Sequence, residues 1–226
     1  MSLPPKILDA LRAAGFVRGT NPQVIALAGG VSCDIWRVAD GDRVFAVKRA
    51  LPRLRVQAEW YADVSRNQHE QNYLRYVGGF LPGAVPRILP CVSARDFFVM
   101  EYLDGAFTDW KSALLAGKVE PGVALAAGKT LGRIHRESWM DASVQRVFAT
   151  DRNFHDLRIA PYLLSTAEKH PDLSEGIRRE AERLAATKLA LVHGDYSPKN
   201  SNARTCPSQN VSVHSRSKAI TNIASL

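Results

Sequence analysis

The stretch that decides the fold lies at residues 191–200 and reads Leu191-Val192-His193-Gly194-Asp195-Tyr196-Ser197-Pro198-Lys199-Asn200. An apolar strand is expected to end at Val192 and to lead into a loop that carries two oxygen-bearing side chains, Asp195 and Asn200. Phosphoryl transfer requires this pairing, because the attacking hydroxyl must be oriented while a metal ion neutralises charge on the phosphate. The alternative is a turn after a buried strand, in which both side chains only cap backbone groups.

The order His-Gly-Asp, four residues and Asn resembles the catalytic loop of protein kinases, where Asp accepts the substrate hydroxyl proton and Asn binds Mg²⁺. Glycine at the second position resembles the aminoglycoside phosphotransferases, the choline kinases and their relatives. The resemblance implies an α+β, bilobal protein-kinase-like fold with a β-rich N-lobe and a helical C-lobe. It also implies ATP and Mg²⁺ as cofactors, Asp195 as the catalytic residue and Asn200 as the metal ligand.

The segment Phe45-Ala46-Val47-Lys48 resembles the kinase strand that ends in a lysine. Because side chains alternate along a strand, Ala46 and Lys48 share one face. The small residue can then lie over an adenine, while the ammonium group reaches the α- and β-phosphates. The alternative is a structural strand that happens to end in a lysine.

A glycine turn, Ala28-Gly29-Gly30-Val31-Ser32, precedes this strand. Its glycines allow backbone N–H groups to approach a phosphate closely. The turn departs from Gly-x-Gly-x-x-Gly but resembles the short Gly-Gly-x-Ser turn of the aminoglycoside phosphotransferase group. The resemblance makes Gly29, Gly30 and Ser32 nucleotide-binding residues, and an ordinary hairpin turn is the alternative.

Kinases pair the strand lysine with a glutamate on the next long helix, which is expected here over residues 56–77. Glu70 is the preferred partner of Lys48, because its helix leads into a proline-containing loop as in the family. Glu59 is the rival, and each glutamate could also be a solvated helix residue.

The run Phe98-Val99-Met100-Glu101-Tyr102-Leu103 resembles the hinge between kinase lobes. There the carbonyl of Glu101 and the N–H of Leu103 would bind the adenine edge, with Met100 behind it. A buried strand leaving the core has the same pattern. His135, on a helix often found before the catalytic loop in this family, is interpreted as a packing residue.

Apolar periodicity and turn residues predict both halves of such a fold. Strands are expected over residues 23–28, 33–39, 43–49 and 97–103, and helices over residues 5–14, 56–77, 110–115, 121–137, 155–169 and 172–187. Asp172 and Glu175 have the spacing of a capping box. The expected domains are an N-lobe over 1–103, a partial C-lobe over 104–200 and a tail outside the family over 201–226.

Residues 201–226 contain six serines and neither Asp nor Glu. The family resemblance implies a second acidic motif after the catalytic Asn, whose Asp binds Mg²⁺, and late helices that shape the acceptor site. The tail is therefore interpreted as the product of a truncation or a shifted reading frame after Asn200, which leaves the C-lobe incomplete. We expect it to be disordered or loosely attached.

The composition is that of a globular protein, with 46% hydrophobic and 23% charged residues. Three cysteines without a CxxC pair argue against a disulfide framework or a zinc site. The chain has no apolar run typical of a signal peptide or membrane span, so the expected location is the cytoplasm, with no membrane partner and no obligate protein partner. The formal charge of +8 would suit a nucleic-acid-binding protein, but its basic residues are scattered without interleaved aromatics. No nucleic acid is expected.

The preferred function is an ATP-dependent phosphotransferase acting on a hydroxyl of a small molecule of the aminoglycoside, sugar or amino-alcohol type. The alternative is an inactive kinase-like remnant that at most binds nucleotide.

Overall fold

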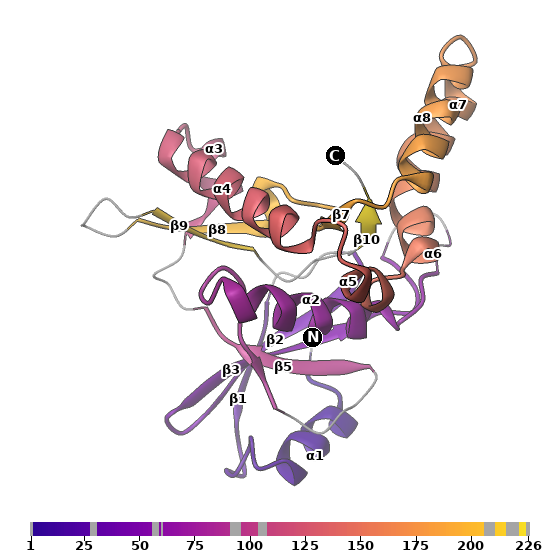
Figure 1. The fold of residues 1–226 in the computed structure, drawn as a ribbon. Helices are drawn as coiled ribbons and strands as arrows, with labels where there is room; N and C mark the ends of the chain where they lie inside the picture. The colour runs from indigo at the N-terminus through magenta and orange to yellow at the C-terminus, as the bar shows by residue number, and fades with distance from the viewer. Residues whose placement is uncertain are drawn as a thin grey trace.

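The computed structural model of the protein describes residues 2–27, 31–55, 59, 61–90, 96–103, 108–205, 211–215 and 222–224. An antiparallel sheet forms the first part of the chain, and the second part is mainly helical (Figure 1). The sheet has the strand order β1-β2-β3-β5-β4. Its strands are β1 Gln23–Ala26, β2 Cys33–Asp40, β3 Arg43–Ala50, β4 Ile88–Leu89 and β5 Phe97–Glu101.

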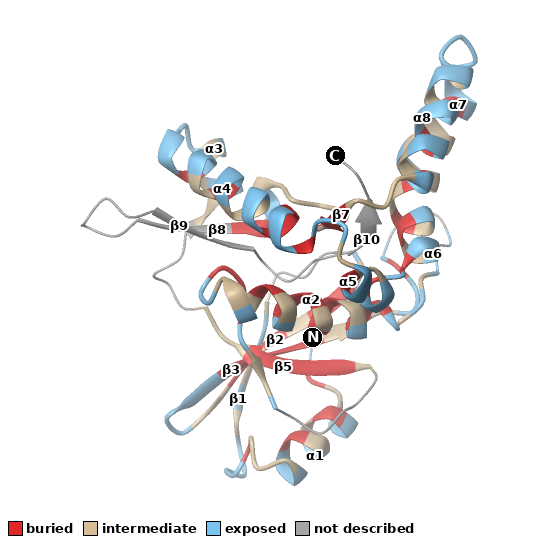
Figure 2. Ribbon diagram, in the orientation of Figure 1, coloured by how far each residue is buried: buried red, intermediate tan, exposed pale blue. Residues whose placement is uncertain are grey.

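A hairpin joins β2 to β3, and Gly41 takes the left-handed conformation (φ 62°) that this turn requires. Helix α1 (Pro5–Ala13) places Ile7 and Leu11 against one face of the sheet. Helix α2 (Arg66–Phe80) places Tyr73 and Leu74 against the other face. The sheet therefore has both faces covered, and the burial of β3 and β5 follows from this (Figure 2).

The second part contains α-helices, a π-helix and a 3₁₀ turn. Their bounds are α3 Trp110–Leu115, α4 Pro121–Ser138, α5 Ala142–Val147, α6 Asp151–Phe154, the π-helix η1 His155–Leu164, α7 Ser165–Lys169, α8 Ser174–Ala186 and the 3₁₀ turn η2 Pro198–Asn200. One apolar core runs from the sheet through α2 to α4, α5 and the strand β7 (Ala190–Val192). This continuity holds the loop after β7 next to the sheet and α2.

Helix α2 begins ten residues later than the sequence predicted. An isolated bridge pairs Arg53 with Tyr61, and Ala62 N donates to Pro52 O at 3.0 Å. The chain therefore doubles back before the helix, and the Asp63 carboxylate accepts from Ser65 N at 2.8 Å where the helix starts. Of the residues predicted to be helical, 56–58 and 60 lie outside the described residues.

The helix predicted over 155–169 is present with those bounds, but as far as Leu164 it is a π-helix, with Pro161 inside it. Helix α8 begins at Ser174, and within the described part of the chain no side chain caps its first turn, so the capping box predicted at Asp172 and Glu175 does not form. Where the helix was expected to start, the chain instead forms a turn in which Leu173 N donates to His170 O at 3.1 Å.

Parts of residues 201–226 form strands, which differs from the expected disorder. Strand β8 (Ser201–Thr205) pairs with β6 (Thr108–Asp109) and with β9 (Val211–Ser215), and β10 (Asn222–Ala224) pairs with β7. Backbone pairing along an open strand edge needs no apolar period in the sequence. Among the described residues, no helix has the length and apolar character needed to cross a membrane.

Candidate active site

Lys48 on β3 and Glu70 on α2 form a buried ion pair. Lys48 Nζ lies 2.6 Å from Glu70 Oε2 and also donates to Oε1, and the two side chains are 3% and 8% exposed. The strand aligns Lys48 between Ile35 of β2 and Phe98 of β5. Burying both charges is tolerated because each neutralises the other.

The rival glutamate, Glu59, lies apart from this pair. It precedes α2 and its carboxylate contacts Arg53 Nη2 at 3.2 Å, with both side chains largely exposed. Of the two carboxylates considered, the structure therefore brings Glu70 to Lys48.

The loop after β7 brings Asp195 and Asn200 together. Gly194 has a φ of 73°, a conformation that a residue with a Cβ rarely adopts. Asn200, at the end of η2, is buried, and its Nδ2 donates to the carbonyl of Asp195 at 3.0 Å. The asparagine thus closes the loop around Asp195.

Aromatic rings attach this loop to helices α2 and α4. The His193 ring lies edge-on to Tyr73 and Tyr196, with centroids 5.5 Å apart in each case. Tyr196 donates its hydroxyl to Ala127 O at 3.1 Å, and burial raises the pKa of Tyr196 to about 12. Asp195 N donates to His193 Nδ1 at 3.3 Å. The loop is therefore fixed on two sides.

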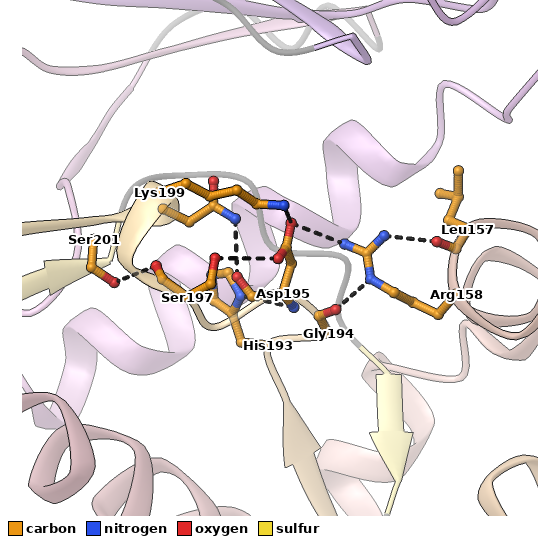
Figure 3. A network of polar contacts seen from close by, with 9 residues as sticks. Leu157, Arg158, His193, Gly194, Asp195, Ser197, Lys199 and Ser201 are labelled. Atoms are coloured by element: carbon orange, nitrogen blue, oxygen red, sulfur yellow. Dashed lines mark hydrogen bonds and ion pairs between the residues drawn. The ribbon is translucent and has the colours of Figure 1, made fainter. Parts of the chain in front are cut away.

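Two cations contact the Asp195 carboxylate (Figure 3). Lys199 Nζ lies 3.1 Å and Arg158 Nη2 lies 3.5 Å from Asp195 Oδ2. Ser197 Oγ donates to Oδ1 at 3.4 Å. Sequence reasoning did not select Arg158 or Lys199. Lys199 could have been found, because it stands four positions after Asp195 in a short loop, whereas Arg158 has no comparable local signal.

The residues predicted to surround an adenine lie on β3, on β5 and directly after β5. Ala46 is buried and aligned with Met100, which is also buried. Glu101 ends β5, and its side chain accepts from Arg87 N at 3.0 Å. Leu103 is half-buried. The structure thus places Ala46 on β3 and Glu101 at the end of the neighbouring strand β5, with Leu103 two residues further along the chain.

Of the predicted phosphate turn, Gly29 and Gly30 lie outside the described residues. Ser32 is described, and its carbonyl accepts from Leu51 N at 3.0 Å and from Arg66 Nη2 at 2.8 Å. Arg66 belongs to the first turn of α2, so the end of the glycine turn is tied to the helix that carries Glu70.

Asn200 could contribute to a metal site. Its Oδ1 is buried and has no hydrogen-bond partner in the described part of the chain, and Mg²⁺ takes oxygen ligands. Within those same residues no group of three or more His, Cys, Asp or Glu could hold a metal. Asn200 Oδ1 is therefore suited to be one ligand of an ion whose other ligands include the phosphates of the substrate, as is common for Mg²⁺.

His135 lies buried on α4, as expected of a packing residue. Its Nε2 has no hydrogen-bond partner among the residues that the structure describes. Burial lowers the pKa of His135 from its ordinary value.

Residues 23–204 match the phosphotransferase enzyme family. This is most of the chain, and the protein therefore belongs to that family. No curated protein is similar enough in sequence to be matched with it.

The fold is similar to solved structures of APH(2″)-IIa and of a choline kinase. The streptomycin–ATP–APH(2″)-IIa complex has a TM-score of 0.58 at 16% identity, over 99% of this chain and 73% of that one. The gentamicin–APH(2″)-IIa complex has a TM-score of 0.61 at 17% identity, over 98% and 72%. Choline kinase from Cryptosporidium parvum has a TM-score of 0.53 at 12% identity, over 97% and 66%. These similarities establish an α+β, bilobal kinase-like fold.

Proposed function

We propose that the protein transfers the γ-phosphate of ATP to a hydroxyl group of a small molecule of the aminoglycoside, sugar or amino-alcohol type. The buried pair of Lys48 and Glu70 carries this proposal. An ammonium group held at a fixed place on a sheet is suited to bind phosphate, and removing it from water is costly unless a carboxylate accompanies it. Membership of the phosphotransferase family and the fold shared with an ATP complex of APH(2″)-IIa support it.

In this proposal the first part of the chain holds the donor. Lys48, steadied by Glu70, contacts the α- and β-phosphates, and the turn of Gly29, Gly30 and Ser32 offers backbone N–H groups to them. Ala46 lies over the adenine. The Glu101 carbonyl and the Leu103 N–H bind the adenine edge.

The loop after β7 carries the chemistry. Asp195 orients the acceptor hydroxyl and takes its proton as the acceptor oxygen bonds to the γ-phosphorus. The bond between that phosphorus and the bridging oxygen breaks, and ADP leaves with the electron pair. Asn200 would hold Mg²⁺, which supplies positive charge that neutralises the phosphate oxygens. A cytoplasmic setting would supply ATP.

Direct phosphotransfer tests the proposal. The protein is incubated with γ-labelled ATP, Mg²⁺ and one aminoglycoside, one sugar or one amino alcohol at a time, beside the Asp195→Asn variant. We expect label in at least one acceptor with the wild type and none with the variant. Nucleotide binding without transfer to any of the three classes would contradict the proposal.

A second candidate is a kinase-like remnant that binds nucleotide without turnover. The observation in its favour is that residues 201–226 contain no Asp or Glu, so they cannot supply a second carboxylate for the metal. The same experiment separates the two candidates.

A further inference from the structure

The guanidinium group of Arg158 bridges η1 and the loop that carries Asp195 (Figure 3). Its Nε donates to the carbonyl of Gly194, its Nη2 lies 3.5 Å from Asp195 Oδ2, and its Nη1 donates to Leu157 O at 2.7 Å. The side chain is only 19% exposed. One planar group therefore contacts both the peptide before Asp195 and the carboxylate itself.

The unusual geometry of η1 helps to place this arginine. Pro161 has no N–H, so an α-helix here would leave the Leu157 carbonyl without its donor four residues later. Residues 155–164 form a π-helix instead, and Leu157 O accepts from Arg158 Nη1. Widened turns of this kind are frequent at functional sites.

The other cation at Asp195 is held differently. Lys199 comes from the loop itself, its side chain is half-exposed, and its ammonium group is a point charge on a flexible stem. A guanidinium is a planar fork, and its contacts with two groups restrain their relative orientation. Arg158 can therefore fix the direction of the carboxylate, while Lys199 mainly balances its charge.

The two cations also place the two carboxylate oxygens of Asp195 in different electrostatic surroundings. Both lie next to Oδ2, whereas Oδ1 receives the long hydrogen bond from Ser197 Oγ. An oxygen with less positive charge beside it is the better proton acceptor. Oδ1 is thus the oxygen to which an acceptor hydroxyl would donate.

We propose that Arg158 is a positioning residue, which orients Asp195 so that Oδ1 is presented to the acceptor hydroxyl. This inference rests on the proposed function, because it gives Asp195 the role of proton acceptor. Misplacing a reacting group by about 1 Å can cost about 100-fold in rate. Loss of the fork should therefore lower kcat and leave the nucleotide affinity unchanged.

The test compares Arg158→Ala and Arg158→Lys with two reference variants. Arg152→Ala removes an exposed arginine that lies 3.7 Å from Asp156 and serves as the matched control. Lys199→Met removes the other cation at Asp195 without touching the Gly194 carbonyl. The measured quantities are kcat, KM for ATP and for the acceptor, and the restoration of kcat by added methylguanidinium.

We expect kcat to fall about 10- to 100-fold in Arg158→Ala, with the KM for ATP changed less than about twofold. Methylguanidinium should restore part of this rate but none of the rate of Asp195→Asn. Arg158→Lys should stay slow, and Arg152→Ala should match the wild type. An unchanged kcat in Arg158→Ala, a loss of the same size in Lys199→Met, or no effect of methylguanidinium would overturn the proposal.

Hydrogen exchange without substrate separates this inference from the proposed function. Backbone amides of residues 193–200 should exchange faster in Arg158→Ala, and in Arg158→Lys if the alanine variant does not fold, than in Arg152→Ala. If the wild type transfers no phosphate, the proposed function fails, and faster exchange alone would still show that Arg158 holds the loop. Equal exchange in the wild type and the Arg158 variants would overturn that role as well.

Discussion

Lys48 and Glu70 stand 22 positions apart in the sequence, and their side chains meet in a buried ion pair between β3 and α2. Removing one partner of such a pair leaves an uncompensated charge in the interior. We therefore expect Glu70→Ala to lose about 3–5 kcal/mol of unfolding free energy, measured by urea titration.

The matched control for this prediction is Glu59→Ala, which removes a carboxylate from an exposed pair with Arg53. Exposed pairs of this kind contribute at most about 1 kcal/mol. Equal losses in Glu70→Ala and Glu59→Ala would show that the buried pair is not the stabilising contact.

Asp195→Asn should abolish phosphotransfer while the protein stays folded. The amide has the shape of the carboxylate but cannot take a proton from the acceptor. Asp195 is partly exposed, so we expect its replacement to change the unfolding free energy by no more than about 1 kcal/mol. A variant that keeps its turnover would make Asp195 a structural residue.

The unfolding free energy should fall as the pH drops below about 6.5, which is the ordinary pKa of a histidine side chain. Burial lowers the pKa values of His135 and His69 in the folded protein. The unfolded chain therefore takes up protons at a higher pH than the folded chain, and protonation favours unfolding. Each neutral histidine makes its full contribution to the unfolding free energy above about pH 6.5. This contribution is lost as the pH falls toward the lowered pKa of that histidine in the folded protein.

His135→Asn should make the unfolding free energy depend less steeply on pH. The slope should decrease by up to about 1.4 kcal/mol per pH unit, which is the largest slope that uptake of one proton on unfolding can produce. Urea titrations between pH 5 and pH 8 provide the measurement, with His170→Asn, which removes an exposed histidine, as the control. An identical slope for the wild type and His135→Asn would contradict the prediction.

The local pattern of the sequence predicted the strands β1, β2, β3, β5 and β7, whereas the resemblance to kinases supplied the pairing of Lys48 with one of two glutamates. Strand alternation places Lys48 on a defined face, and helix periodicity brings Glu70 to the side of α2 that packs on the sheet. The start of α2 was missed because the Arg53–Tyr61 bridge depends on contacts across a loop. Arg158 was missed because its partners lie 36 and 37 positions away, and no local period reports such contacts.

Residues 201–226 contain no Asp or Glu side chain that could bind a metal. Replacing them with a family-like segment that carries the acidic motif should increase turnover, since charge neutralisation dominates catalysis of phosphoryl transfer. ATP consumption and acceptor phosphorylation are compared at matched, monodisperse concentrations. Equal turnover would mean that the missing carboxylate is not required or comes from elsewhere in the chain.

Calorimetric titration with MgATP tests the central claim, that the first part of the chain binds the donor through Lys48. The titration is run on the wild type, on Lys48→Ala and on Lys6→Ala, which removes an exposed lysine of α1. Charge-assisted contacts to phosphate contribute about 1.5–3 kcal/mol. We therefore predict binding to the wild type and to Lys6→Ala, and a loss of at least about tenfold in affinity for Lys48→Ala. Equal affinity of the wild type and Lys48→Ala for MgATP would contradict the account.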